Sequence, residues 1–237
     1  MGVGGRAMSE QLSLAEIRAK AHEVPDHVFC CNLPLYVLLE KRPRPNAPDW
    51  VEVGCWKQDE AEGMMVYLSL IDAMIDLYSR NRDGRRYQIF PFESIDPRPF
   101  INGHEGWLTV YLAYGFAARS DGLLLSEKGE PMSLMQGTHF QIATDTTEHF
   151  HLQFGDKLLS WLDRLHEKAG IPDYGRVAQE HAEASSAELN GLAQEALRRI
   201  TAHNSAQTES SHCALYDPIE QEWRLVDFAD LSMQEAR

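Results

Sequence analysis

The chain has 237 residues, with 36 acidic and 22 basic side chains and a formal net charge of −14. Its 43% hydrophobic and 24% charged content excludes wholesale disorder, and no apolar run approaches the roughly 18–20 uncharged residues of a membrane span. Because so acidic a surface repels phosphate backbones and anionic lipid, it argues against nucleic-acid and membrane partners and favours a protein partner with a basic surface, although acidity for solubility alone is common.

The N-terminal segment lacks the continuous apolar stretch of a secretory signal, and either Met1 or Met8 could be the native start. The cysteines are Cys30, Cys31, Cys55 and Cys213. A chain of this size needs no disulfide, so we expect buried, reduced thiols on strands and a cytoplasmic location.

In chain order, the first predicted element is a helix from Ser13, since Ser13 and Glu16 have the spacing of a capping box and Pro25 ends the segment. Residues 27–41 are rich in β-branched, aromatic and aliphatic side chains, which predicts a strand. The alternating residues 50–57 predict its hairpin partner. Pro34 must then lie at an edge or a bulge.

A strand–helix–strand unit is predicted over residues 64–92. Residues 64–68 and 87–92 have strand character. Between them, five apolar residues recur at the spacing of one helix face: Leu70, Ile71, Met74, Ile75 and Tyr78. Asp72 and Asp76 fall on the opposite side, which predicts that both face solvent.

Further strands are predicted at residues 107–116, 123–125 and 139–143, the first of them long and central. From Thr147 the apolar spacing becomes helical up to Gly170, and a second helix is predicted after Pro172.

We expect one α+β domain with a mixed, mainly antiparallel sheet packed against two or three helices and a C-terminal β-hairpin. The predicted segments are an N-terminal helix (1–26), a sheet-rich core (27–145), a helical segment (146–203), a linker (204–211), and a hairpin with a tail (212–237). Such a hairpin is too small to be stable alone, so it should dock on the main sheet.

The common phosphate-loop, nucleophile-elbow and zinc-protease motifs are absent. The best alternative is a metal site formed by His139, His149, His151 and Glu148, since His149 and His151 would share one face of a strand. A helix beginning at Thr147 would separate those two histidines. We therefore expect no metal ion and no cofactor.

Two other clusters could carry chemistry. Asp72 and Asp76 could act as an acid–base pair if burial separated their proton affinities, but a solvated helix face is the favoured interpretation. Cys30 or Cys55 could form a nucleophile pair with a distant histidine, although no spacing supports it. The one basic cluster consists of Arg80, Arg82, Arg85 and Arg86 and could bind an anion or an acidic segment. The preference for cations at the end of a helix already explains half of these arginines.

Acidic residues are densest between Asp173 and Glu195. Helical spacing places several of them on one exposed ridge, and Glu180, Glu183 and Glu188 are the residues we expect to bind a basic partner, since complementary charge speeds encounter and enforces specificity. A solvated helix flank is the alternative interpretation.

The segment Tyr67-Leu68-Ser69-Leu70, continuing into Ile71-Asp72-Ala73 and followed by a strand at Tyr87, resembles the strand–Ser–helix–strand unit of SseB-like domains. The whole chain also resembles bacterial polymorphic-toxin immunity proteins in its acidity and lack of catalytic motifs. These resemblances imply a non-enzymatic binding protein that inhibits a toxin by direct binding. A hydrolase with a carboxylate or His-bound metal site and a structural adaptor subunit are the alternatives.

Overall fold

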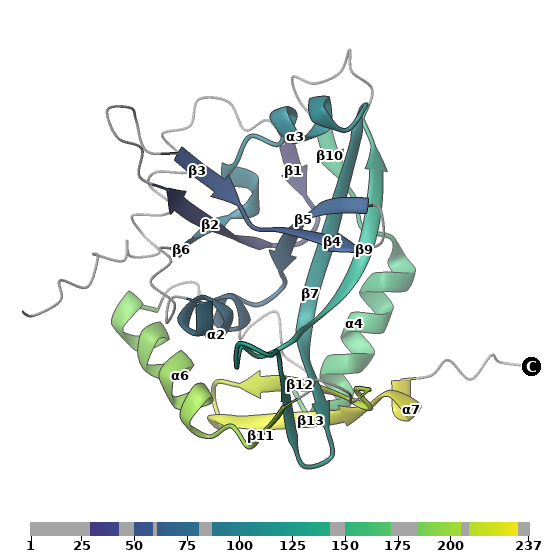
Figure 1. The fold of residues 1–237 in the computed structure, drawn as a ribbon. Coiled ribbons are helices and arrows are strands. Elements are labelled where there is room, and N and C mark those ends of the chain that lie inside the picture. Colours follow the sequence, from purple (N-terminus) through teal and green to yellow (C-terminus); the bar gives the residue numbers. More distant parts are fainter. Residues whose placement is uncertain are drawn as a thin grey trace, which may run out of the picture.

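The computed structural model describes residues 29–42, 50–58, 61–80, 87–142, 150–171, 184–204 and 209–231. Its centre is one large mixed sheet built around β7 (Trp107–Arg119), a strand of 13 residues (Figure 1). On one side β7 pairs in parallel with β5 (Ala61–Tyr67), and on the other it pairs antiparallel with β9 (Ser133–Gln141). The predicted long central strand is thus confirmed.

A second group of strands extends the sheet beyond β5. β2 (Tyr36–Arg42) pairs antiparallel with β6 (Tyr87–Pro91) on one side and with β5 and β3 (Trp50–Val53) on the other. The chain continues through Gly54 into β4 (Cys55–Gln58), which pairs with β5. The Gly54 N–H donates to Leu38 and its carbonyl accepts from Met65, so this residue lies between β2 and β5. The predicted hairpin of β2 and β3 is confirmed.

The far end of β7 carries the C-terminal hairpin. β12 (His212–Asp217) pairs antiparallel with β13 (Glu222–Asp227) and with the end of β7, which confirms that the hairpin docks on the main sheet. A short helix, α7 (Phe228–Leu231), follows. On the other side of β7, β8 (Gly122–Leu125) pairs antiparallel with it and in parallel with β11 (Ala202–Asn204).

Helices cover both faces of the sheet. On one face lie α2 (Leu70–Arg80) and α6 (Ser186–Arg198), whose apolar side chains share a core with β2, β5 and β12. On the other lies α4 (Asp156–Lys168), which packs on a core that includes β1 (Phe29–Cys31) and its parallel partner β10 (Phe150–Leu152) (Figure 1). The short helices η2 (Phe92–Ser94) and α3 (Arg98–Gly103) connect β6 to β7. This is the predicted α+β class.

Within the described residues, no helix is both long and apolar enough to cross a lipid bilayer.

Three predicted boundaries are wrong. The helix expected from Thr147 begins only at Asp156, because residues 150–152 pair with β1 as a strand. β9 begins at Ser133 rather than at His139, since the length of β7 gives the earlier residues a partner. Asn204, predicted to start a linker, ends β11. Pro34 lies in the connection between β1 and β2, and the expected N-terminal helix falls outside the described residues.

Gly115 allows β7 to bend where its partners change. The register to β9 shifts between Ala113 and Gly115, the mark of a β-bulge. Gly115 has a φ of +155°, and a Cβ there would lie 2.7 Å from the Sγ of Cys213. Only glycine meets both conditions, and the close approach lets β12 pack directly on β7.

Candidate protein-binding site

The first candidate site lies on α2, which is enclosed on both sides. The helix begins after Ser69, whose Oγ accepts a hydrogen bond from the Asp72 N–H at 3.4 Å. One side of α2 faces the sheet, and the apolar residues Leu189, Ala193 and Ala196 of α6 share its core on the other. The predicted solvent-facing position of the α2 carboxylates is therefore wrong: Asp72 is 4% exposed and Asp76 is 1% exposed.

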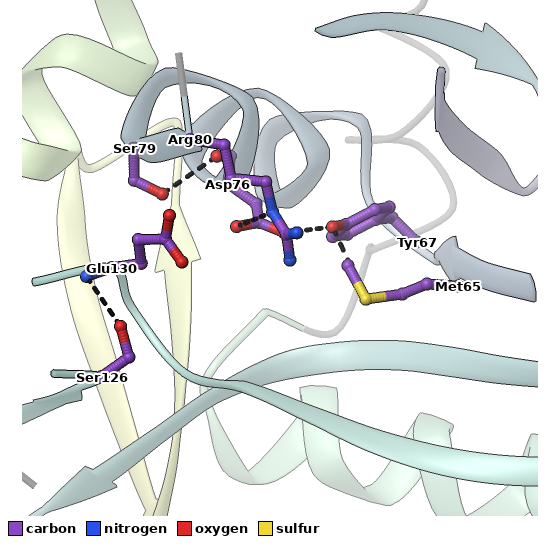
Figure 2. A network of polar contacts seen from close by, with 7 residues as sticks. All are labelled: Met65, Tyr67, Asp76, Ser79, Arg80, Ser126 and Glu130. Carbon is purple, nitrogen blue, oxygen red and sulfur yellow. Dashed lines mark hydrogen bonds and ion pairs between the residues drawn. The ribbon is translucent and has the colours of Figure 1, made fainter. Parts of the chain in front are cut away.

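Asp76 is held by two partners. The Tyr67 hydroxyl donates a short hydrogen bond to Oδ2, and the Arg80 Nε donates to Oδ1 at 2.9 Å (Figure 2). Burial works against the charged Arg80 guanidinium, but the neighbouring Asp76 carboxylate raises the pKa of Arg80, so the guanidinium stays charged. Burial, reinforced by Asp76, raises the pKa of Tyr67 well above its usual value, so the hydroxyl stays a donor.

Asp72 is in a different situation. Its carboxyl is fully enclosed, and burial together with the neighbouring Asp76 charge raises its pKa to about 7. The pKa of the Cys213 thiol is also raised, first by burial and then by Asp72, so the thiol stays protonated at neutral pH, where Asp72 is close to half-protonated. A raised pKa on one of two neighbouring carboxyls is one feature of an acid–base pair.

Access to the cluster decides whether it can act on a substrate. The cavity beside Tyr67 and Arg80 has a volume of about 20 Å³ and is closed by Leu38, Gly54, Cys55, Trp56, Met65 and Tyr87. A single water needs roughly 10–15 Å³ by this kind of measure, so the cavity has room for one water and not for a substrate. We therefore interpret the cluster as a buried polar connection between α2 and β5. Removing one partner from such a pair costs about 3–5 kcal/mol.

The histidines expected as alternative metal ligands do not form a described cluster. His139 lies on β9 and contacts the Thr109 hydroxyl through Nδ1 at 3.0 Å. His151 lies on β10, opposite Cys30, in a separate two-stranded sheet. His149 and Glu148 fall outside the described residues. Among the residues that the structure does describe, no three histidine, cysteine or acidic side chains are placed to hold a metal ion.

The other predicted clusters are also separated. Arg80 is engaged by Asp76, while Arg82, Arg85 and Arg86 fall outside the described residues. None of the four cysteines is in a disulfide. The prediction that they are buried holds for Cys213 alone: Cys31 is half-buried, and Cys30 and Cys55 are exposed. Cys30 alternates with the buried Phe29 on the short strand β1 and therefore points outward.

The predicted acidic ridge is described only in part. Glu180 and Glu183 fall outside the described residues, and Glu188 lies in the first turn of α6. Glu188 completes a capping box: its N–H donates to the Ser185 Oγ at 3.3 Å, and its carboxylate accepts from the Ser185 N–H at 2.8 Å. The Ser185 hydroxyl also donates to this carboxylate at 2.7 Å. This hydrogen bond first, and the one from the Ser185 N–H second, lower the Glu188 pKa and keep the side chain ionised.

Glu188 lines an open groove of about 570 Å³ between α6 and the turn of the C-terminal hairpin. We call it the α6 groove, and its lining residues are Ala184, Glu188, Gly191, Leu192, Glu195, Ile219 and Gln221. Ile219 is 53% exposed, the largest exposed fraction among the exposed large apolar side chains of the described residues. The groove therefore combines two carboxylates with an apolar wall, and none of its lining residues in the described part of the chain is basic.

The hairpin side of the groove was not predicted from the sequence. Ile219 lies in the turn between β12 and β13, and its N–H donates to the Asp217 Oδ1 at 3.0 Å. An apolar residue in the middle of a polar turn was the available signal. The proximity of this turn to α6 is a tertiary feature that local spacing does not encode.

Comparison with known proteins adds no family: no protein-family model, no curated protein and no solved structure matches the chain.

Proposed function

We propose that the protein is a non-enzymatic binding protein that holds a basic segment of another protein in the α6 groove, in the manner of an immunity protein that neutralises a toxin. The observation that carries the proposal is the pairing of ionised Glu188 with the exposed apolar side chain of Ile219 in one groove. A cationic side chain beside an aliphatic one on the partner would satisfy both features.

The two groove carboxylates contribute differently. Glu195 already forms ion pairs with Arg198 at 2.6 Å and with Arg199 at 2.7 Å. Glu188 is bonded only to the neutral Ser185, so its negative charge has no cationic partner among the described residues. A lysine or arginine of the partner would therefore gain most from Glu188, and the net charge of −14 would attract it from a distance.

The alternatives have less support. A hydrolase using Asp72 and Asp76 would need space for a substrate, and the cavity beside their cluster holds about one water. A hydrolase using a metal ion would rest on His149 and His151 together with His139. His139 and His151 lie in separate sheets, and His149 falls outside the described residues. A structural adaptor would use the same groove and differ from an immunity protein only in the identity of the partner.

A synthetic peptide of lysine and leucine, designed to place both side-chain types on one helix face, is the probe that tests the groove. We expect its fluorescence anisotropy to report binding at low salt that weakens as salt rises. Ile219→Lys should weaken binding about tenfold, because it removes the apolar wall and adds a like charge. Glu188→Gln should weaken binding by about threefold, since glutamine keeps the capping box and loses only the charge.

Leu225→Lys is the matched control. Leu225 is 37% exposed on β13 and lies outside the lining of the groove, so this variant adds the same charge elsewhere and should bind the peptide like wild type. Equal binding by wild type and Ile219→Lys, or equal loss in both lysine variants, would remove the groove from the proposal. Native co-purification at low salt then identifies the partner. The wild-type protein should recover this partner, and the Ile219→Lys variant should recover much less of it.

A further inference from the structure

The outer edge of β9 is a second surface with a recognisable partner. β9 has nine residues and pairs with β7 through its inner edge, and no described strand pairs with its outer edge (Figure 1). Just beyond its ends, the Ile142 N–H donates to Gly106 and the Met132 carbonyl accepts from Ala117. Because backbone direction alternates along a strand, even-numbered residues of β9 bond to β7. The backbone groups of odd-numbered residues therefore point outward.

The outward groups have few internal partners. The Gly137 carbonyl accepts a hydrogen bond from the Gln136 side chain at 3.0 Å, an interaction confined to the edge itself. No other backbone hydrogen bond of the described residues involves the outward-pointing amides and carbonyls, which belong to Met135, Gly137, His139 and Gln141. Such a row of unpaired groups is a template for another strand.

Two other strands of the sheet, β6 and β13, carry residues that protect against strand addition, and β9 does not. β6 ends at Pro91, and β13 carries Glu222, Arg224 and Asp227. β9 reads SLMQGTHFQ and has no Asp, Glu, Lys, Arg or Pro. Charges and prolines are the usual protection of sheet edges, so their absence over nine residues distinguishes this edge.

The strand is also held rigidly. Leu134 and Phe140 pack against the cores on the α4 side, and Met135 packs against the core on the α2 side. At the centre, the Tyr111 ring lies against Gly137, where a Cβ would be 3.1 Å from its Cε1. A strand fixed from both faces binds another strand at a lower entropic cost than a mobile one.

We propose that the outer edge of β9 pairs antiparallel with β9 of a second copy of this chain, about a two-fold axis through Gly137. Gly137 is the middle residue of Ser133–Gln141, so this axis uses the full strand. It places Gln136 opposite Thr138 of the second copy, and Met135 opposite His139 of the second copy. Neither pair contains an Asp, Glu, Lys or Arg residue.

Charge favours a second copy at this edge over the basic partner of the α6 groove. Two copies that each carry −14 repel wherever their acidic surfaces meet, and β9 itself carries no acidic residue. The edge offers a cationic partner no carboxylate. Since salt screens the remaining repulsion beyond about 8 Å at physiological ionic strength, self-pairing should strengthen with salt. Peptide binding in the α6 groove should instead weaken as the salt concentration rises.

Sedimentation velocity tests the pairing through charge exchange. A glutamate variant (Gln136→Glu with Thr138→Glu) and a lysine variant (Gln136→Lys with Thr138→Lys) each place like charges opposite one another, and each should be a monomer where wild type is a dimer. An equimolar mixture of the two places opposite charges across the axis and should restore the dimer. Loss of folding alone cannot give that rescue.

A third variant controls for charge by itself. Ala187→Glu with Thr201→Glu adds two carboxylates at exposed positions away from β9 and should dimerise like wild type. A wild type that stays monomeric at high salt, a charge variant that still dimerises alone, or a mixture that stays monomeric would overturn the proposal. All β9 variants should bind the lysine–leucine peptide like wild type, so failure of the dimer is distinct from failure of the α6 groove.

Discussion

Two carboxylates on successive turns of α2 have different effects on stability because their surroundings differ. Asp76 is compensated by a hydroxyl donor and a guanidinium, and Figure 2 shows these groups gathered between α2 and β5. Asp72 is buried beside the Asp76 charge without a comparable donor among the described residues. An unpaired buried charge is costly, so Asp72 is a residue at which pH acts on the fold.

The direction in which pH changes the stability follows from the pKa of Asp72. The folded-state pKa of about 7 lies above the ordinary 3.8, so between about pH 4 and about pH 7 the folded state binds the Asp72 proton more tightly than the unfolded state does. The contribution of Asp72 to stability should therefore fall as pH rises through this window. Asp72→Asn cannot ionise and should be more stable than wild type at about pH 8, by up to ~4 kcal/mol, and by much less at about pH 4.5.

Urea denaturation at the two pH values measures the difference. Asp96→Asn is the control, because Asp96 is exposed and hydrogen bonds from Arg98 lower its pKa. Its removal should change the free energy of unfolding by less than ~1 kcal/mol and in the destabilising direction. An Asp72→Asn variant less stable than wild type at about pH 8 would contradict the assignment.

At the scale of elements, alanine substitutions at two glycines should change the stability of the protein in opposite directions. Gly115→Ala adds a Cβ where φ is +155° and the Cys213 Sγ is 2.7 Å away, so we expect a loss of ~2 kcal/mol or more. Gly191 lies within α6 with no atom near its missing Cβ. Gly191→Ala should stabilise the protein by ~0.5–1 kcal/mol, because alanine has the higher helix propensity. Thermal unfolding of both variants checks the pair, and equal destabilisation would refute the bulge assignment.

Elements with a strong local signal were predictable from the sequence. The unit over residues 64–92 has a short apolar run followed by helical spacing, and it folds as β5, α2 and β6. The strand–turn–strand pattern at the C-terminus likewise gives β12 and β13. Segments whose structure depends on a distant partner were not predictable. Phe150–Leu152 continues a helical apolar spacing yet forms a strand, because β1, more than a hundred residues earlier, supplies its hydrogen bonds.

The residues of the candidate site likewise fall into those that the sequence predicts and those that it does not. Glu188 was predicted as a binding residue from charge density, and its position at the start of a helix follows from Ser185 and Glu188, whose capping-box spacing is visible in the sequence. Its apolar neighbour Ile219 could not be predicted as such, since a turn 31 residues later meets α6 only in the folded chain. The same reason explains Asp72 and Asp76: the periodicity of α2 is real, but the side that carries Asp76 lies against Tyr67 of β5, while α6 contacts Tyr78 of the apolar side.

At the scale of the whole molecule, the C-terminal hairpin closes a core contributed by distant parts of the chain. Leu165 lies in α4 and Ile171 in the segment that follows it. Cys213 and Leu215 lie in β12, and Val226 lies in β13. The hairpin also supplies Ile219 to the α6 groove. Stability of the hairpin and integrity of the proposed binding site are therefore coupled, and the hairpin should not open independently of the sheet.

The reactivity of the Cys213 thiol tests whether the hairpin opens only together with the sheet. It is fully buried between β12 and the bulge at Gly115, whereas Cys30 is exposed on β1. In a variant that retains Cys213 alone, with serine at the other three cysteines, a thiol reagent should react only when the core opens. If the hairpin opens only with the whole molecule, the free energy of opening from the labelling rate should equal the global free energy of unfolding and fall with urea at the same slope. A variant retaining Cys30 alone should react at once at every urea concentration. Cys213 labelling that is fast and independent of urea would mean that the hairpin frays locally, and the α6 groove would then lack a fixed wall.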